Sequence, residues 1–134
     1  MNIDKKYYQE INENLTNTIQ DTNISAPNKK VGKVRDAYFL NDKVVMISTD
    51  RQSAFDRVLA AIPYKGAVLN SVSAWWFKKT EHLFPNHLIS TPDPNVSIVE
   101  KCTVFPVEFV VRGYITGTTD TSLWTVYNLS LIHI

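Results

Sequence analysis

The chain has 134 residues, of which 44% are hydrophobic and 20% charged, enough for one globular domain with its own core. A formal net charge of +1 and scattered basic residues exclude the long-range field of a duplex-binding protein, so nucleic acid is not expected as the main partner. Cys102 is the only cysteine, which excludes an internal disulfide and favours a reducing compartment.

The N-terminus carries Asp4, Lys5 and Lys6 where a signal peptide would need an apolar run. No apolar stretch approaches the roughly 20 residues that span a bilayer. We therefore expect a cytoplasmic protein with no membrane partner.

Hydrophobic periodicity predicts the secondary structure. Apolar residues at spacings of three and four indicate amphipathic helices, and alternating apolar residues between turn formers indicate strands. In the first half of the chain the expected elements are a helix over residues 4–19 with Asp4 as N-cap, a loop over 21–30, and strands over 32–40 and 43–48 joined by a turn at Asn41–Asp42. A strand over 58–62 and a helix after Lys65–Gly66 follow. The last part is expected to contain a short strand over 88–90, a turn over 91–95, strands over 96–105 and 106–112, and a final helix from near Ser122 capped by Thr119, Asp120 or Thr121.

Several residues that often carry function are expected to be structural here. Cys102 lies within a predicted strand as a small buried residue, and His82 and His87 lack a third ligand at a usable spacing for zinc. The helix after Gly66 carries its bulky apolar residues on one stripe, so its tryptophans are expected in the core. The stripe consists of Val68, Leu69, Val72, Trp75 and Trp76.

The first predicted strand combines cations with a glycine. Lys33 and Arg35 share one face of this strand by its period of two, and Gly32 precedes them. Two cations beside a glycine at the edge of a hairpin suit the phosphates of a nucleotide. A solvated strand face with Asp36 as counter-charge is the alternative.

Polar groups crowd the segment after the apolar strand over 43–48. Residues 49–56 are expected as a loop that presents binding groups to a polar substrate or a hydrated cation. The alternative is a turn stabilised by its own side chains, with an internal Arg–Asp pair. The binding groups are Asp50, Arg51, Ser53 and Asp56.

Two further stretches suit an anion. Lys65 stands just before the N-terminus of its helix, where partial positive charge already favours a phosphate. Residues 106–119 are expected to place Glu108 and Arg112 on one strand face and then pass two glycines and several threonines, a combination that suits a clamp for phosphate or carboxylate. An Arg112–Glu108 pair beside an ordinary turn is the alternative.

Four motifs in this order resemble the SAICAR synthetase family, the phosphoribosylaminoimidazole-succinocarboxamide synthases of purine biosynthesis. The resemblance covers residues 30–128 and implies an α+β fold, with an antiparallel sheet and flanking helices similar to the small lobe of kinase-like and ATP-grasp enzymes. The motifs are Gly32-Lys-Val-Arg-Asp36, Ser48-Thr-Asp-Arg-Gln-Ser-Ala-Phe-Asp56, Lys65-Gly66 with Leu69, Ser73 and Trp76-Phe77, and Pro106-Val-Glu-Phe-Val-Val-Arg-Gly-Tyr-Ile-Thr-Gly-Thr118.

The resemblance implies an ATP-dependent ligase that joins L-aspartate to carboxyaminoimidazole ribotide (CAIR) through an acyl phosphate, giving SAICAR, ADP and phosphate. Thr118 replaces the more usual serine and keeps the hydroxyl, and the acidic ligands of Mg²⁺ are expected in the second half of the family fold. No catalytic residue is assigned. The implied ATP-binding residues are Gly32, Lys33, Arg35, Lys65 and Glu108, and the implied substrate-binding residues are Asp50, Arg51, Ser53, Asp56, Arg112 and Thr118.

The end of the chain departs from the family pattern. In the family, a segment similar to the one ending at Asn128 is followed by a second α/β portion, and residues 129–134 do not resemble its start. We expect a helix and linker over 1–29, a SAICAR synthetase-like domain over 30–128 and an unrelated tail over 129–134. A chain truncated in this way is expected to be inactive alone. A non-catalytic nucleotide- or phosphate-binding module is the alternative function.

Overall fold

The computed structural model describes residues 5–26, 28–54, 57–107, 109, 111 and 113–129. The chain divides into two compact units, Met1–Cys102 and Thr103–Ile134, and the described strands all belong to the first. Within the described ranges, no helix is both long and apolar enough to cross a membrane.

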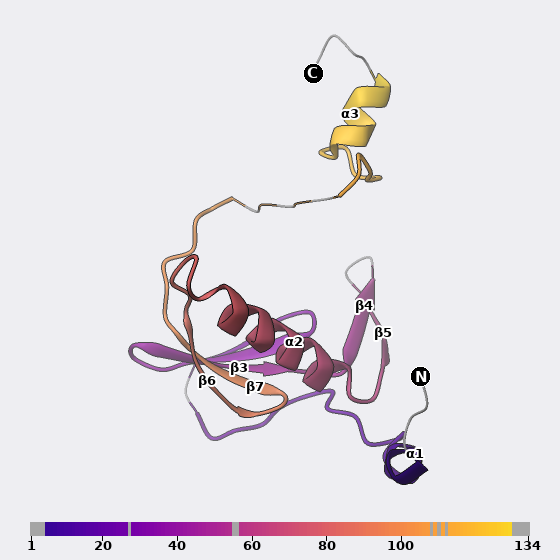
Figure 1. Ribbon diagram of the computed structural model, residues 1–134, viewed down its shortest axis with the longest axis vertical. Helices are drawn as coiled ribbons and strands as arrows, with labels where there is room; N and C mark the ends of the chain where they lie inside the picture. Colours follow the sequence, from indigo (N-terminus) through magenta and orange to yellow (C-terminus); the bar gives the residue numbers. More distant parts are fainter. Residues whose placement is uncertain are drawn as a thin grey trace. The chain divides into compact units, whose positions relative to one another are not determined.

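Among the described residues, seven strands and two helices belong to the first unit and a short helix to the second (Figure 1). Five strands form one antiparallel sheet in the order β1-β2-β3-β7-β6, and β4 pairs with β5 in a separate hairpin. This arrangement confirms the α+β class with an antiparallel sheet. The elements are α1 (Lys5–Glu13), β1 (Lys29–Val31), β2 (Arg35–Phe39), β3 (Lys43–Ser48), β4 (Arg51–Ala54), β5 (Arg57–Ala61), α2 (Lys65–Thr80), β6 (Leu88–Asp93), β7 (Val96–Glu100) and α3 (Leu123–Leu129).

The centre of the sheet is the strand that the sequence predicts most strongly. β3 has the predicted bounds of 43–48, and its β-branched residues pair with β2 on one side and β7 on the other. Val44 lies opposite Phe39 and Val99, and the predicted turn before β3 is closed by the Leu40 amide, which donates to the Lys43 carbonyl (2.9 Å). The buried apolar residues of the described chain are Tyr38, Val44, Ile47 and Val99.

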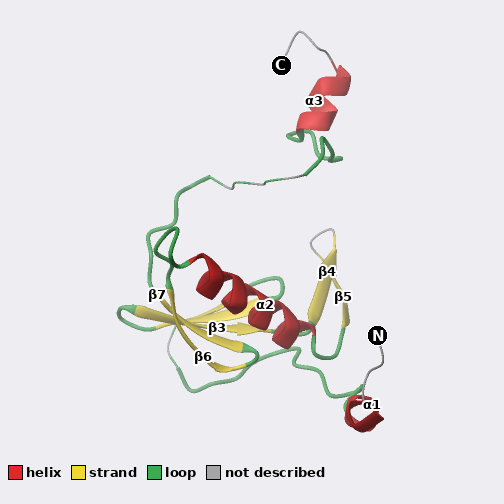
Figure 2. Cartoon of the chain, viewed as in Figure 1, coloured by secondary structure: helices red, strands yellow, loops and turns green. Residues whose placement is uncertain are grey.

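Helix α2 contacts β3, β7 and β6 (Figure 2), and its buried residues are Gly66 and Asn70. A Cβ added to Gly66 would lie 2.3 Å from the Ser48 carbonyl oxygen, so the backbone of the helix approaches the end of β3 more closely than any other residue allows. Buried Asn70 accepts a hydrogen bond from the Ser97 hydroxyl (2.7 Å) and donates one to the Pro94 carbonyl (3.0 Å). These contacts fix the helix on the sheet.

The bulky apolar stripe of α2 is exposed, and its predicted place in the core was wrong. Trp75 and Trp76 keep 52% and 57% of their surface exposed, and the three aliphatic residues of the stripe are exposed as well. The small residues of the helix repeat with the same helical period as the large ones. The sheet contacts the small-residue face because that face permits the shorter approach.

Two predicted boundaries in the first unit were wrong because of pairing between distant residues. Helix α1 ends at Glu13 rather than near residue 19, since residues 19–24 form hydrogen bonds with β2 and with the segment after β3. β6 extends through Asp93 into the stretch predicted as a turn, because it pairs with β7.

The prediction for residues 96–122 was also wrong in part. β7 ends at Glu100, and Cys102 is exposed rather than buried. The described residues of 106–112 are not in a strand. The final helix begins at Leu123, and its N-cap is Ser122, whose hydroxyl oxygen accepts a hydrogen bond from the Thr125 amide (3.3 Å).

A buried polar network lies between the N-terminal segment, β2 and β4. The Asp36 carboxylate is fully buried and accepts hydrogen bonds from Arg51 Nη2 and from the Thr22 hydroxyl, both at 2.7 Å. Lys29 Nζ lies 3.2 Å from the same carboxylate. The Tyr38 hydroxyl donates to the Thr22 carbonyl (2.9 Å), so residues far apart in sequence share one set of hydrogen bonds.

This network shifts the protonation of its members. Burial by itself would raise the pKa of Asp36, but the hydrogen bonds from Arg51, Thr22 and Lys29 outweigh burial and hold that pKa below its ordinary value of 3.8. The hydrogen bond to Asp21 outweighs partial burial and, together with Asp36, raises the pKa of Lys29 to about 12. The folded state therefore stabilises the charged form of both groups.

The contact at Gly66 predicts a large effect of one methyl group. Gly66→Ala is expected to lower the free energy of unfolding by about 1–3 kcal/mol, because the added carbon meets backbone atoms that cannot rotate away. Urea denaturation followed by circular dichroism measures the change. Gly113→Ala is the control, since its added carbon would meet nothing within 4 Å, and equal stability losses for the two variants would contradict the assignment.

The Asp36 network predicts acid sensitivity. Because the folded-state pKa of Asp36 lies below 3.8, its contribution to stability is present above that pH and is lost as the pH falls through the folded-state pKa. Asp36→Asn should lower the free energy of unfolding at neutral pH by about 3 kcal/mol, because Arg51 loses its buried counter-charge, and it should flatten the acid dependence. Exposed Asp42→Asn is the control, expected to cost less than about 0.5 kcal/mol. An unchanged acid slope in Asp36→Asn would contradict the assignment.

Candidate functional site

The site begins at the turn of residues 32–34, which joins β1 to β2 and is called the hairpin turn from here on. The Gly32 amide donates to the Arg35 carbonyl (2.8 Å), and a Cβ on Gly32 would lie 2.8 Å from that carbonyl oxygen. The strand predicted from residue 32 therefore starts at Arg35. Lys33 lies in the turn and not on a shared strand face with Arg35, and both residues are exposed.

Arg51 holds the hairpin turn from the protein side. Its Nη2 donates to the Gly32 carbonyl (3.0 Å) and its Nε to the Lys33 carbonyl (3.2 Å). Its Nη1 donates to the Gln20 carbonyl (2.6 Å), and the side chain is 9% exposed beside Asp36. The guanidinium thus connects the N-terminal segment, the turn and β2.

The loop predicted over residues 49–56 is a strand in its middle, and that prediction was wrong for 51–54. β4 pairs antiparallel with β5, with a register shift between Gln52 and Ser53. Pairing to a partner strand satisfies the backbone of polar residues as well as that of apolar ones, so side-chain polarity alone did not reveal the strand. Ser53 is half-buried opposite Val58.

Asp50 links the site to helix α2. It is buried, and its two carboxylate oxygens accept hydrogen bonds from the amides of Gly66 and Ile19, both at 2.8 Å. The N-terminus of α2 therefore binds a carboxylate of its own chain at the position where the sequence suggested a phosphate. Lys65 is the first residue of this helix, and its Nζ donates to the Arg51 carbonyl (3.0 Å).

The first unit therefore brings most of its predicted site residues together. The hydrogen bonds above connect the hairpin turn, the segment after β3 and the start of α2. Arg35 lies at the start of β2 opposite Ser48, next to this cluster in sequence. The predicted site residues Asp56, Glu108 and Arg112 lie outside the described residues. The connected residues are Gly32, Lys33, Asp50, Arg51 and Lys65.

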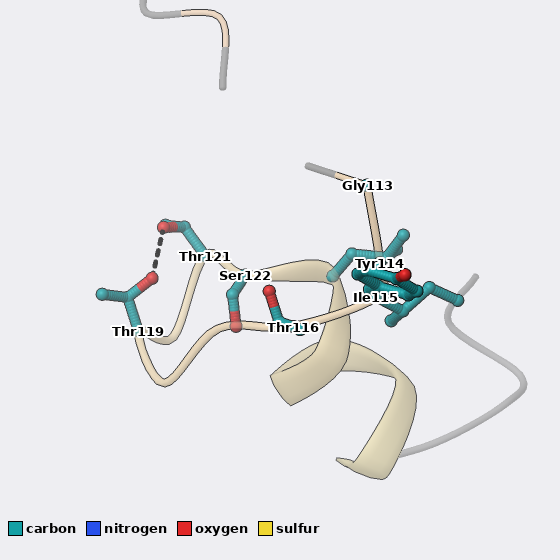
Figure 3. A pocket seen from close by; sticks show the side chains of 8 residues that line it. Gly113, Tyr114, Ile115, Thr116, Thr119, Thr121 and Ser122 are labelled. Carbon is teal, nitrogen blue, oxygen red and sulfur yellow. Dashed lines mark hydrogen bonds between the residues drawn. The ribbon is translucent and has the colours of Figure 1, made fainter. Parts of the chain in front are cut away.

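The second unit contains a pocket of about 520 Å³ whose lining combines threonine and serine hydroxyls with apolar groups (Figure 3). The side-chain hydroxyl oxygens of Thr119 and Thr121 lie 3.4 Å apart on the loop before α3. Gly117 has a φ of 127°, a backbone conformation that favours glycine, and the predicted site residue Thr118 follows it as an exposed residue. Hydroxyl groups and close backbone suit the oxygens of a phosphate. The lining residues are Gly113, Tyr114, Ile115, Thr116, Thr119, Thr121, Ser122 and Leu123.

Sequence reasoning missed the residues that support the site. Asp36 was weighed only as a counter-charge on a solvated face, yet it is fully buried. The period of two places Asp36 and Tyr38 on the same face of β2, and the aromatic residue marks that face as the inner one. No local sequence pattern indicated that the Thr22 hydroxyl joins this network, because its hydrogen-bond partners Asp36 and Tyr38 lie 14 and 16 positions away.

No group of three or more His, Cys, Asp or Glu side chains able to hold a metal ion occurs among the residues that the structure describes. The cluster around the hairpin turn is instead rich in cations and backbone amides, which suit an anion.

Comparison with known proteins gives concordant matches. The family model described as SAICAR synthetase matches residues 28–130. A phosphoribosylaminoimidazole-succinocarboxamide synthase from Legionella pneumophila (strain Lens) is 62% identical over 109 residues, which are 81% of this chain and 35% of that protein. A chloroplastic synthase of the same name from Arabidopsis thaliana is 58% identical over 123 residues, 88% of this chain and 30% of that protein.

Solved structures agree with the sequence matches. A SAICAR synthase from Saccharomyces cerevisiae complexed with SAICAR superposes with a TM-score of 0.73 at 30% identity, covering 84% of this chain and 45% of that one. A type-2 SAICAR synthetase in complex with ADP has a TM-score of 0.54 at 30% identity, covering 59% and 35%. The chain spans about a third of the length of the curated relatives it matches. On the family model, the sequence identities and the shared fold together, the chain belongs to the SAICAR synthetase family.

Proposed function

We propose that this chain supplies nucleotide- and substrate-binding groups to an ATP-dependent ligase that joins L-aspartate to CAIR. In this reaction the CAIR carboxylate takes the γ-phosphoryl group of ATP, giving an acyl phosphate and ADP. The aspartate amine then attacks the acyl carbon, the C–N bond forms, and phosphate leaves as SAICAR is released. The names and bound ligands of the matched relatives support this reaction for the family fold.

The observation that carries the proposal is the clustering of the hairpin turn, Arg51 and Lys65 by hydrogen bonds between distant segments. Transfer of a phosphoryl group depends mainly on positioning and on positive charge around its oxygens. Lys33, Arg35 and Lys65 supply three cations at or beside this cluster. We therefore assign the ATP phosphates to it, with Gly32 allowing close approach of the backbone and Glu108 remaining a predicted contact of the nucleotide.

The substrate side is proposed to take the remaining predicted residues. Both carboxylate oxygens of Asp50 already accept hydrogen bonds from the amides of Gly66 and Ile19. Asp50 is therefore proposed to support the substrate site by holding these two backbone segments in place. The threonine and serine hydroxyls in the pocket of the second unit support a phosphate-binding role for its neighbour Thr118. The other residues proposed for substrate binding are Ser53, Asp56 and Arg112. Arg51, which the sequence also placed among the substrate contacts, donates its hydrogen bonds to the hairpin turn and to Asp36 instead.

The proposed reaction also needs Mg²⁺ as a cofactor. We assign no Mg²⁺ ligand to the described residues, because they contain no suitable cluster, and we propose that the ion is held by acidic residues of the family fold beyond the matched part. When bound, Mg²⁺ would neutralise charge on the ATP phosphates. We propose a cytoplasmic enzyme acting on the small molecules ATP, L-aspartate and CAIR.

A graft tests this function. Residues 28–130 would replace the matching stretch of the Legionella pneumophila relative, and ADP release would be followed with a coupled assay. We expect ADP release that requires both aspartate and CAIR. ATP binding without aspartate-dependent turnover would contradict the ligase and favour the non-catalytic nucleotide-binding module.

Lys65→Met in the same graft tests the nucleotide cluster. Loss of one cation beside the phosphates should raise the KM for ATP about tenfold and leave the KM for aspartate within about twofold. Lys78→Met is the matched control, because Lys78 is an exposed lysine in the last turn of the same helix. Equal effects of the two substitutions on the KM for ATP would remove Lys65 from the site.

A further inference from the structure

We propose that Arg51 is a positioning residue that shapes the hairpin turn for the phosphates of ATP, and does not itself touch a substrate. This inference rests on the proposed nucleotide role of the turn. It differs from the sequence-based expectation, which placed Arg51 among the substrate contacts. The structure favours the positioning role through the direction of its hydrogen bonds and through its burial.

The guanidinium is already engaged by the protein. Each of its three nitrogens donates to an oxygen of the chain, at distances from 2.6 to 3.2 Å. Three of the acceptors are main-chain carbonyls, and the fourth is the buried Asp36 carboxylate. With 9% of its side chain exposed, Arg51 has little surface left for a ligand.

These hydrogen bonds determine which way the peptides of the turn face. The carbonyls of Gly32 and Lys33 point toward the guanidinium. In a trans peptide the N–H of the next residue points opposite to the carbonyl, and the described chain contains no cis peptide bond. The N–H groups of Lys33 and Val34 are therefore directed away from Arg51.

Successive amides that point the same way attract an anion. Two adjacent N–H groups form a concave donor surface that accommodates phosphate oxygens, and a nearby cation strengthens it. Gly32 and Lys33 are exposed and Val34 is half-buried, so part of the turn lies at the surface of the unit. Arg51 would thus support nucleotide binding from behind, by orienting two peptide planes.

A second anchor keeps Arg51 itself in place. Lys65 donates to the main-chain carbonyl of Arg51, while Thr49 donates through its amide (3.0 Å) and its hydroxyl (2.9 Å) to the Val34 carbonyl. The turn is therefore held at three consecutive carbonyls, those of residues 32, 33 and 34. A lysine at position 51 keeps the charge beside Asp36 but offers one ammonium in place of a planar fork, so it cannot bind all these acceptors.

Calorimetric titration of the 134-residue chain with ATP and, separately, with CAIR tests the inference. Arg51→Lys should weaken the affinity for ATP about tenfold, because the amides lose their fixed direction, and should change the affinity for CAIR less than about twofold. Arg57→Lys is the matched control, since Arg57 is an exposed arginine at the start of β5. Circular dichroism spectra verify that each variant is folded.

A second variant keeps the test decisive if Arg51→Lys does not fold. Val34→Pro removes the N–H of residue 34 and keeps its carbonyl, which Thr49 binds. It should weaken ATP binding by a similar factor although Arg51 is not substituted. Weaker CAIR binding with unchanged ATP affinity in Arg51→Lys would overturn the inference in favour of direct substrate contact. A lower melting temperature with both affinities unchanged would overturn it in favour of a scaffold role alone.

Failure of the inference and failure of the proposed function give different results. If the unsubstituted chain binds ATP and Arg51→Lys binds it equally well, only the positioning role is wrong. If the unsubstituted chain does not bind ATP, the nucleotide assignment of the turn is wrong, and the inference falls with it.

Discussion

The ion pair between Asp36 and Arg51 is the interaction on which the first unit depends. A fully buried carboxylate is costly unless its charge is paired and its oxygens are hydrogen-bonded, and both conditions are met here. Because Arg51 also binds the carbonyls of Gln20, Gly32 and Lys33, the pair joins four segments of the chain. The position of the hairpin turn follows from this single buried charge pair.

Helix α2 is positioned by a different constraint, the need for close backbone contact. Gly66 lets the first turn of the helix approach the end of β3, and Asp50 binds the amide of the same residue. Together they place Lys65 beside the Arg51 carbonyl. The two constraints meet at neighbouring residues, Asp50 and Arg51, so the segment after β3 determines both where the turn lies and where the helix starts.

This arrangement gives the polar segment after β3 a role different from that of a free loop. Asp50 and Arg51 of this segment are buried and bind main-chain groups of other segments, whereas Lys33 and Arg35 are exposed on the elements that this segment supports. A binding site for phosphates can then consist of main-chain amides with a fixed direction and of lysine side chains that need not be rigid. Such a division agrees with phosphoryl-transfer sites in general, where positioning and positive charge carry most of the effect.

The sequence by itself determined the family, the α+β class, the strand over 43–48 and the residues that gather around the hairpin turn, because motif order and short-range periodicity are local properties of the chain. Only the tertiary structure decided that α2 uses its small face, that residues 51–54 pair as a strand, and that Arg51 is buried against Asp36. These outcomes depend on partners such as Asp36 and Arg51, 15 positions apart, or Ser48 and Asn95, 47 apart. Local pattern carries no information on which distant group will satisfy a buried charge or admit a close helix.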